Sequence, residues 1–241
     1  MTATGNHGSS GCCAASTDVS SSDCCSNPRL DKSTTAALDE IRFEEPPPDV
    51  AAIRSTGFKL LLDTGRPVAI SDLVTATGIP AERVTEIIGN VRARGRVELD
   101  NENRLIGLAG LSLTPGRHEI TIGGITRWTW CALDAIGILG ALNATGTVKS
   151  TDPQTGHTIT IAFNNGRPET DAHLFILSGY SEDHVREEWC PRVNFFDGHD
   201  AASEWAAANG LDGDTIAVAD VTGEAAAMWE SVVNPKDPQV S

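Results

Sequence analysis

The sequence lacks several features that would place it in a common functional class. No stretch approaches the roughly 18–20 consecutive apolar residues of a membrane span, and the N-terminus has neither the basic nor the apolar region of a signal peptide. Basic residues are scarce, with 18 Lys and Arg against 33 Asp and Glu in 241 residues, for a formal net charge of −15. Phosphate backbones repel such a chain. We therefore expect no export, no membrane attachment and no nucleic-acid partner.

The motifs of several enzyme classes are also missing. There is no Gly-rich phosphate loop and no Gly-x-Ser-x-Gly sequence, so nucleotide-dependent enzymes and serine hydrolases have no support. The six histidines show no HxH or HExxH spacing, which argues against a zinc or iron site built from them. The apolar fraction of 40% is nevertheless ample for a folded core at this length.

Cysteine is the unusual part of the composition. Four cysteines form two adjacent pairs, Cys12-Cys13 and Cys24-Cys25, and the remaining two, Cys131 and Cys190, lie far along the chain. A secreted disulfide framework would distribute its cysteines through a small, loop-rich chain. Adjacent cysteines also rarely bond to each other, because the bond strains the peptide between them. We infer a reducing compartment in which the thiols serve chemistry or metal binding.

The chain divides into four predicted segments. Residues 1–28 contain too few large apolar residues to offset the entropy of ordering, so we expect a disordered, cysteine-containing arm. A winged-helix-like domain is predicted for residues 29–113, a catalytic α+β domain for 114–236, and a short tail for 237–241. The first domain begins with a brief helix around Thr34 to Ile41 and the stiff connector 46–48, which is three prolines.

The winged-helix prediction rests on a pattern of three helices and a hairpin. Ser71 can cap the second helix, Pro80 suits the first position of the third, and Gly95 can end it. The third helix has apolar residues at helical spacing, namely Val84, Ile87, Ile88 and Val91. Two strands, 96–100 and 104–113, then flank the polar turn 101–103 and form the wing.

A transcriptional role for this domain is weakened by its charge. Between Ala51 and Arg104 there are eight basic and seven acidic residues, so the module is about neutral. Arg92, Arg94 and Arg96 form a small basic cluster at the C-terminal end of the third helix, whereas a DNA reader contacts bases from the N-terminal end. We favour a structural cap on the partner domain over DNA binding.

The second domain mixes short strands with helices, which is typical of an α+β fold with a mixed sheet. Its predicted elements are a helix at 131–142, a hairpin around the turn 152–156, a buried strand at 173–180, a helix at 200–209 and a final strand and helix at 215–221 and 223–233.

The chemistry is predicted to lie at Cys131 and Asp134. Cys131 follows a strand and opens a helix, where unpaired N–H groups and the helix dipole favour a thiolate. Asp134 lies three residues on and shares a face with Cys131. Taken alone this pattern is weak, because a cysteine is often a core residue and an aspartate in a first helical turn is ordinary.

Cys190 strengthens the prediction. It directly follows Trp189, just as Cys131 follows Trp130, in a chain with five tryptophans. The two Trp-Cys pairs indicate two thiols that line one aromatic-walled site. Phe195 and Phe196 are further candidates for the wall, with a core position as the alternative for all four aromatic residues.

The motifs around these residues resemble a known family. In order along the chain they are WCALDAIGILGAL, TVKSTDPQTGHTITI, WCPRVNFF and EWAAANGLDG. Together they resemble the bacterial organomercurial (alkylmercury) lyases from about residue 50 to about residue 235, including a winged-helix-like N-terminal domain.

The resemblance implies a cytoplasmic enzyme that cleaves the carbon–mercury bond by protonolysis and releases a hydrocarbon and Hg(II). Cys131 and Cys190 would bind the mercury of the substrate and product, and Asp134 would be the acid/base. No cofactor would be required, free thiols would be co-reactants for product release, and a mercuric reductase is a candidate acceptor of Hg(II). The chemistry agrees, because mercury is a soft ion that prefers thiolates and a carboxyl group can transfer the proton.

The sequence departs from the family at two positions. Asp152 stands where many members carry a further cysteine in the hairpin, and Pro191 stands where some carry a second cysteine. Neither departure touches the proposed chemistry.

The arm lies outside the resemblance. Cys12, Cys13, Cys24 and Cys25 could wrap a soft ion, which would let the arm scavenge mercury or hold Hg(II) for transfer; the alternative is a tolerated tail. Two other functions remain open for the whole chain: a metal-responsive winged-helix regulator, which the negative charge disfavours, and a soft-metal carrier. A carrier has no need for Asp134.

Overall fold

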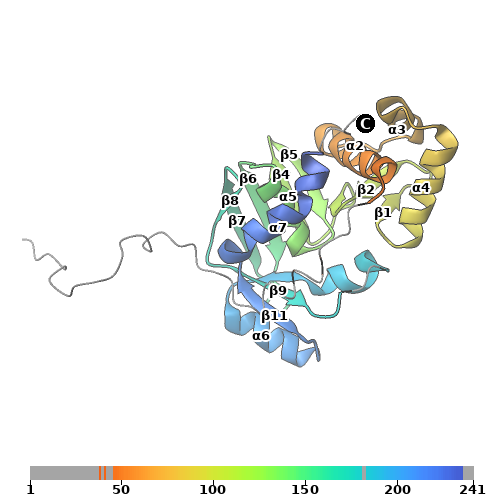
Figure 1. Ribbon diagram of the computed structural model, residues 1–241. Coiled ribbons are helices and arrows are strands. Elements are labelled where there is room, and N and C mark those ends of the chain that lie inside the picture. Colours follow the sequence, from red (N-terminus) through yellow and green to blue (C-terminus); the bar gives the residue numbers. More distant parts are fainter. Residues whose placement is uncertain (1–37, 39–40, 42–45, 181–182, 236–241) are drawn as a thin grey trace, which may run out of the picture.

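A computed structural model describes Leu38, Ile41, residues 46–180 and residues 183–235 (Figure 1). The predicted arm and tail and most of the predicted helix from Thr34 to Ile41 lie outside the described residues. Within the described part, no helix is both long enough and apolar enough to cross a bilayer. The helices and antiparallel sheets confirm the predicted α+β class.

Three helices come first in the described chain. They are α2 (Pro48–Thr64), α3 (Ile70–Thr77) and α4 (Ala81–Ala93). Pro48 opens α2, where its missing N–H costs nothing. The predicted cap of α3 at Ser71 is wrong, because the helix already begins at Ile70 and the Asp72 carboxylate accepts the Ala69 N–H at 3.1 Å. In α4 the predicted apolar face is buried at Val84, Ile87 and Ile88.

The predicted wing is divided into three strands. β1 (Val97–Leu99) pairs antiparallel with β2 (Leu105–Leu108), but a turn at Ala109 and Gly110 then starts a new strand, β3 (Leu111–Ser112). Both turn residues have positive φ, 52° and 83°. β3 pairs with a strand of the second region, so the hairpin joins the large sheet. The winged-helix assignment and the boundary at residue 113 stay predictions.

The large sheet has eight strands in the order β1-β2-β3-β5-β4-β6-β7-β8. Its remaining strands are β4 (His118–Ile122), β5 (Ile125–Thr129), β6 (Gly146–Thr151), β7 (Thr158–Asn164) and β8 (Arg167–Glu169). The predicted hairpin around residues 152–156 is confirmed as β6 and β7. Where we expected a mixed sheet, the described strand pairs are all antiparallel. A parallel pair needs a long crossover, and most of these strands are joined by short turns.

A smaller sheet carries the C-terminal part. Its order is β10-β9-β11, with β9 (His173–Leu177) between β10 (Asn194–Phe196) and β11 (Gly213–Ala217). Helix α6 (His199–Ala208) covers it (Figure 1) and packs Ala202 and Ala206 on Phe175 and Phe196. Between β9 and β10 the chain forms η1 (Val185–Trp189) and η2 (Cys190–Arg192).

Two helices form the centre of the molecule. All of α5 (Ala132–Ala141) except Gly140 is buried, and α7 (Val218–Val233) packs against it. The contact is so close that a Cβ on Gly137 would lie 2.3 Å from the Trp229 ring. Trp229 also donates its indole N–H to the carbonyl of Ala109 at 2.9 Å. Trp229 therefore links the middle of α5 to the Ala109-Gly110 turn.

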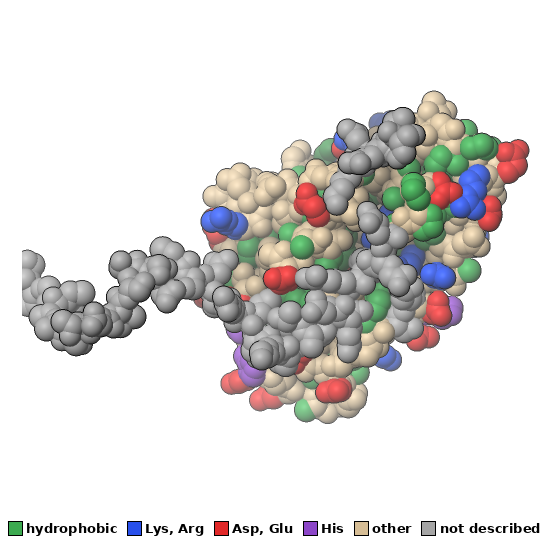
Figure 2. All heavy atoms as spheres, viewed as in Figure 1, with side chains coloured by type: hydrophobic (Ala, Val, Ile, Leu, Met, Phe, Trp, Pro, Cys, Tyr) green, Lys and Arg blue, Asp and Glu red, His purple; other side chains and the backbone are tan. Residues whose placement is uncertain are grey.

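The surface of the helical region carries both basic and acidic side chains. On the face in Figure 2, basic and acidic side chains are interspersed over the end of the molecule formed by α3 and α4. Arg83 of α4, for example, pairs with Asp49 and Glu86. This distribution agrees with the near-neutral charge that the sequence assigns to the module.

Candidate functional site

Cys131 occupies the N-cap position of α5, as predicted. Its backbone is extended, with φ −145° and ψ 175°, and its Sγ accepts the backbone N–H of Asp134 at 3.4 Å. In return, Oδ2 of Asp134 accepts the backbone N–H of Cys131 at 2.8 Å. This reciprocal cap satisfies two helix N–H groups and fixes the thiol and the carboxylate relative to each other.

The short helices η1 and η2 bring Cys190 to the same place. The backbone N–H of Ala132 donates to the carbonyl of Val193 at 3.1 Å and joins the two segments. One ligand atom each from Cys131, Asp134 and Cys190 lies within 4.8 Å of the other two. These residues are only 1%, 6% and 2% exposed. In the part of the chain that the structure describes, they form the one cluster that could hold a metal ion, and no histidine belongs to it.

Burial controls the protonation of this cluster. It raises the pKa of Cys131 well above the usual range, and the neighbouring Cys190 and Asp134 raise it further. The hydrogen bond from Cys131 lowers the pKa of Cys190, but burial and the nearby carboxylates outweigh it and the pKa is raised. Both cysteines are therefore thiols at neutral pH, and the expectation that the helix dipole makes Cys131 a thiolate is wrong for the unliganded site.

Asp134 behaves differently from the two cysteines. Burial raises its pKa to about 6, although the hydrogen bonds from Cys131 and the charge of Arg54 oppose the shift. At neutral pH this group is mostly a carboxylate in contact with a protonated thiol. The site can accept a proton when a soft ion binds the sulfur, and it can return that proton to an acceptor nearby.

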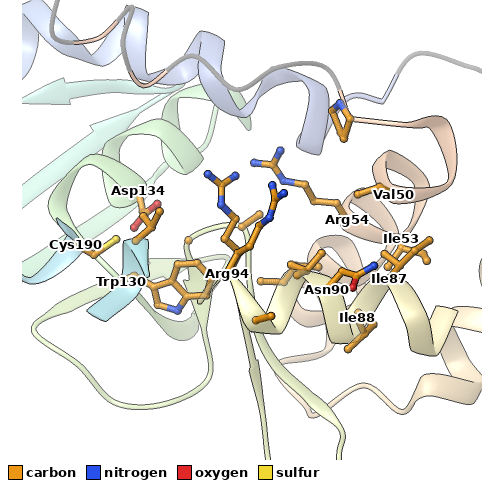
Figure 3. Close-up of a pocket in the computed structure, with 18 of the residues that line it drawn as sticks. Val50, Ile53, Arg54, Ile87, Ile88, Asn90, Arg94, Trp130, Asp134 and Cys190 are labelled. Atoms are coloured by element: carbon orange, nitrogen blue, oxygen red, sulfur yellow. The ribbon is translucent and has the colours of Figure 1, made fainter. Parts of the chain in front are cut away.

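The cluster lies at one end of a pocket of about 650 Å³ (Figure 3). Trp130 and Trp189, the residues that precede the two cysteines, line it. Apolar side chains from α2 and α4 also line it, namely Val50, Ile53, Ile87, Ile88 and Val91. In Figure 3 the first four lie at the end away from Cys190. Phe195 and Phe196 are not among the lining residues that the structure describes; both are buried in the core. The site is therefore a deep cavity with an apolar wall and two thiols at its end.

Comparison with known proteins identifies the relatives of this chain. Residues 111–230, which contain all three clustered residues, match the family model described as alkylmercury lyase. Curated alkylmercury lyases of Bacillus cereus and Staphylococcus epidermidis are each 30% identical to it, over 152 and 150 residues. These alignments cover 60% of this chain and 66% and 67% of the relatives, about two thirds of their length. The chain belongs to the alkylmercury lyase family.

The fold agrees with that membership. The crystal structure of the mercury-bound form of MerB2 superposes with a TM-score of 0.74, covering 82% of this chain and 97% of that chain at 22% identity. The motifs around Cys131 and Cys190 predict membership in the alkylmercury lyase family, and this prediction is confirmed.

Gly110 is a residue of the site that the sequence did not single out. A Cβ at this position would lie 2.2 Å from Oδ1 of Asp134, and the backbone has φ +83°. Only glycine satisfies both conditions without strain. The available signal was a glycine inside an otherwise strand-like run, which marks a turn or a close approach of the backbone.

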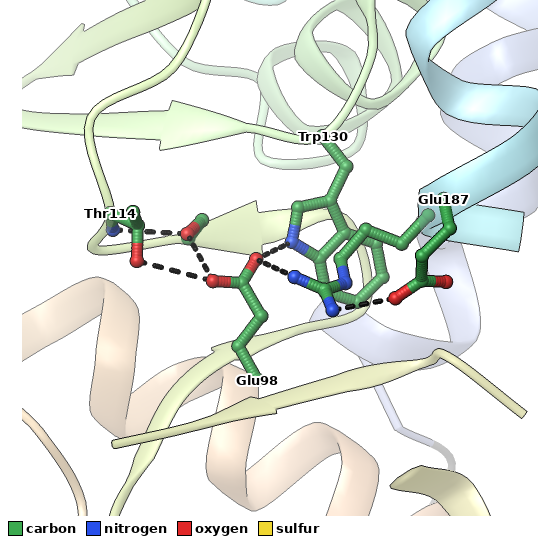
Figure 4. Close-up of polar contacts among 6 residues, drawn as sticks. Glu98, Thr114, Trp130 and Glu187 are labelled. Carbon is green, nitrogen blue, oxygen red and sulfur yellow. Dashed lines mark hydrogen bonds and ion pairs between the residues drawn. The ribbon is translucent and has the colours of Figure 1, made fainter. Parts of the chain in front are cut away.

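Glu98 is a second unexpected residue, and it anchors Trp130 (Figure 4). Its carboxylate accepts the indole N–H of Trp130 and, at 3.2 Å each, the hydroxyls of Ser112 and Thr114. Arg186 of η1 lies 3.7 Å from the same carboxylate. Glu98 thus links the β1–β2 hairpin to the tryptophan beside Cys131 and to the segment that precedes Cys190. Nothing local in the sequence indicates these long-range contacts.

Neither of the two departures from the alkylmercury lyase pattern is a lining residue of the pocket. Asp152 is buried at the β6–β7 turn, where Oδ1 accepts the N–H groups of Gln154 at 2.7 Å and Thr155 at 3.1 Å. It stabilises the turn. Pro191 is exposed in η2. Cys12, Cys13, Cys24 and Cys25 lie outside the described residues.

Proposed function

We propose that this chain is an organomercurial lyase that cleaves carbon–mercury bonds by protonolysis. The observation that carries the proposal is the buried cluster itself, in which two thiols and a carboxyl group lie within 4.8 Å of one another. Mercury is a soft ion, so it prefers two sulfur ligands over the oxygen and nitrogen ligands that harder ions select. Membership in the alkylmercury lyase family supports the same chemistry.

Mercury capture is the first step. The Sγ of Cys131 forms a bond to mercury and displaces the thiolate or halide ligand that the organomercury compound carries, while the thiol proton passes to the Asp134 carboxylate, which already contacts Cys131. Cys190, in the same cluster, supplies the second sulfur, and its proton leaves with the displaced ligand. Because the pKa of both thiols is raised in the free site, metal binding rather than the helix dipole drives their deprotonation.

Protonolysis follows from the same arrangement. Two sulfur ligands increase the electron density on the carbon attached to mercury, so that this carbon becomes easier to protonate. Asp134 delivers the proton that it took from Cys131, the carbon–mercury bond breaks, and the hydrocarbon leaves. Asp134 returns to the carboxylate form. In total, one thiol proton enters the C–H bond, the other leaves with the displaced ligand, and Hg(II) stays on two thiolates.

Product release needs a further thiol. Free thiols take Hg(II) from Cys131 and Cys190 as co-reactants, or a mercuric reductase accepts it. No redox change occurs in these steps, so no cofactor is required. Two free buried thiols suit a cytoplasmic, reducing location.

The cysteines of the arm can add capacity for mercury. Cys12, Cys13, Cys24 and Cys25 offer four thiols within a short segment. We propose that they scavenge mercury or hold Hg(II) for transfer. Replacing all four with serine would then lower the number of mercury ions bound per chain. Unchanged stoichiometry and turnover would refute a role of the arm in mercury binding.

The experiment for the lyase activity is headspace gas chromatography with phenylmercury and excess small thiol. It uses the full chain with the four arm cysteines replaced by serine, so that bound mercury reports on Cys131 and Cys190. Benzene is expected from this protein, and Asp134→Asn should lower its formation by at least about 10²-fold, the usual scale for general acid catalysis. Cys190→Ser should abolish it.

Asp152→Asn is the matched control, because Asp152 is a buried aspartate outside the pocket and asparagine keeps its accepting oxygen. It should leave benzene formation unchanged. A protein that binds mercury but releases no benzene would refute the lyase for this substrate and leave a soft-metal carrier.

A further inference from the structure

Three of the five tryptophans of the chain line the pocket that contains the cysteine cluster. They are Trp130, Trp189 and Trp229. Figure 3 shows Trp130 at the same end of the cavity as Asp134 and Cys190. The end of the pocket that suits mercury therefore has aromatic side chains in its wall.

The single N–H group of each of these indole rings is already used inside the protein. Trp130 donates to the Glu98 carboxylate, and Trp229 donates to the carbonyl of Ala109 at 2.9 Å. Trp189 donates to a carbonyl of β9 at 3.1 Å. Because an indole has no other hydrogen-bonding group, the three rings offer only carbon atoms to a ligand. The same bonds hold the rings in place before a ligand arrives, which lowers the entropy cost of binding.

Trp130 is the ring that a ligand can reach most easily. It is half-buried, whereas Trp189 and Trp229 are only 5% and 3% exposed. The backbone N–H of Trp130 donates to the carbonyl of Gly110 at 3.0 Å, and Gly110 lies against the carboxylate of Asp134. A carbon that Asp134 protonates must lie close to that carboxylate. The organic group that is attached to mercury through this carbon therefore lies close to Trp130.

We propose that Trp130, Trp189 and Trp229 form a binding site for an aryl group, which makes arylmercury compounds the preferred substrates of this chain. The inference deepens the proposed function and rests on it. A cavity of about 650 Å³ has room for an aromatic ring together with the mercury atom. Aromatic rings in contact prefer edge-to-face or offset-stacked arrangements, and such pairs add to binding beyond the burial of apolar area. A saturated ring of the same size buries a similar area but lacks this contribution.

Competition for the cysteine cluster tests the proposal without any need for carbon–mercury cleavage. The test protein is the full chain with Asp134→Asn, which slows cleavage, and with the four arm cysteines replaced by serine. Phenylmercury and cyclohexylmercury are added in equal excess, both as their complexes with 2-mercaptoethanol. The two protein adducts are then quantified by intact mass spectrometry. We expect the phenyl adduct to exceed the cyclohexyl adduct about fivefold, the scale of one aromatic contact.

Substitution at Trp130 links this preference to the aromatic wall. Trp130→Leu keeps an apolar side chain but removes the ring, so it should reduce the adduct ratio to about two or less, whereas Trp130→Phe should retain most of it. Trp128→Leu is the matched control, since Trp128 is also half-buried but is not among the described lining residues. It should leave the ratio unchanged. An adduct ratio near one before any change at Trp130, a preference that survives Trp130→Leu, or an equal loss with Trp128→Leu would overturn the proposal.

A cleavage experiment separates this proposal from the lyase itself. The same two complexes compete for the chain with Asp134 intact, and benzene and cyclohexane are measured by headspace gas chromatography. A benzene-to-cyclohexane ratio that falls with Trp130→Leu but not with Trp128→Leu supports selection of the aryl group during turnover. If neither hydrocarbon forms, the lyase is refuted, and the adduct ratio still decides whether the tryptophans bind an aryl group.

Discussion

The carboxylate of Asp134 and the thiol of Cys131 are held together by two hydrogen bonds of opposite direction. Oδ2 of Asp134 accepts the Cys131 N–H at 2.8 Å, and Sγ of Cys131 accepts the Asp134 N–H at 3.4 Å. A motif that normally caps a helix thus places a proton acceptor beside a protonated sulfur. The same contacts stabilise the helix end and position the two groups that we propose to react.

The pH dependence of capture follows from Asp134. Its pKa is raised from 3.8 to about 6, so the carboxylate form is lost as the pH falls through about 6. Capture needs that form to accept the proton of Cys131. We expect kcat/KM for phenylmercury to be level above pH 7 and to fall about tenfold per pH unit below pH 6. Single-turnover benzene formation from pH 5 to 8 measures this, and a flat profile over that range would contradict it. Asp134→Asn should lack the acid limb.

Gly110→Ala should displace the carboxylate. The new Cβ would lie 2.2 Å from Oδ1 of Asp134, at a φ of +83°. A shift of about 1 Å in a catalytic group can cost about 10²-fold in rate, and we expect a loss of that order in benzene formation. Gly123→Ala controls for backbone strain, because Gly123 also has positive φ but nothing within 4 Å of a Cβ. Equal activity of the two variants would show that Asp134 tolerates the intrusion.

Glu98→Gln should loosen Trp130. Glutamine keeps one acceptor but loses the charge that the indole, two hydroxyls and Arg186 share. We expect the free energy of unfolding to fall by about 1–2 kcal/mol and KM for phenylmercury to rise more than kcat falls. Urea unfolding and steady-state kinetics give both values. Glu102→Gln, on the neighbouring exposed turn, should change neither; a similar effect of the two variants would mean that Glu98 acts only through net charge.

Gly137→Ala should destabilise the core. Its Cβ would meet the Trp229 ring at 2.3 Å between α5 and α7. Overpacking of this kind typically costs about 1–3 kcal/mol in the free energy of unfolding. Gly223→Ala on the exposed side of α7 has open space and should instead stabilise by up to about 1 kcal/mol through helix propensity. Thermal unfolding of the two variants should shift in opposite directions, and a stable Gly137→Ala protein would show that the helices can separate.

Local patterns were sufficient to predict much of the secondary structure. The apolar spacing in α4, the turn between β6 and β7 and the helix after Cys131 are set by neighbours in the chain, and all three are observed. The wing was predicted as one hairpin, because a continuous apolar run does not reveal that Ala109 and Gly110 adopt positive φ. That turn packs against Asp134 and accepts a hydrogen bond from Trp229, and both residues come from distant parts of the chain.

The sequence by itself was enough to propose Cys131, Asp134 and Cys190 as the reacting residues, because two Trp-Cys pairs and a nearby aspartate can be recognised from residue types and spacing. Only the tertiary structure decided their protonation. Burial among packed helices and strands raises the pKa of both thiols and of Asp134, and it outweighs the helix dipole that the local sequence indicated. Tertiary structure also decided that Arg54, Arg94 and Arg96 face the same pocket as the cysteines. The pKa of a side chain depends on its desolvation and on the charges around it, and the fold determines which residues surround it.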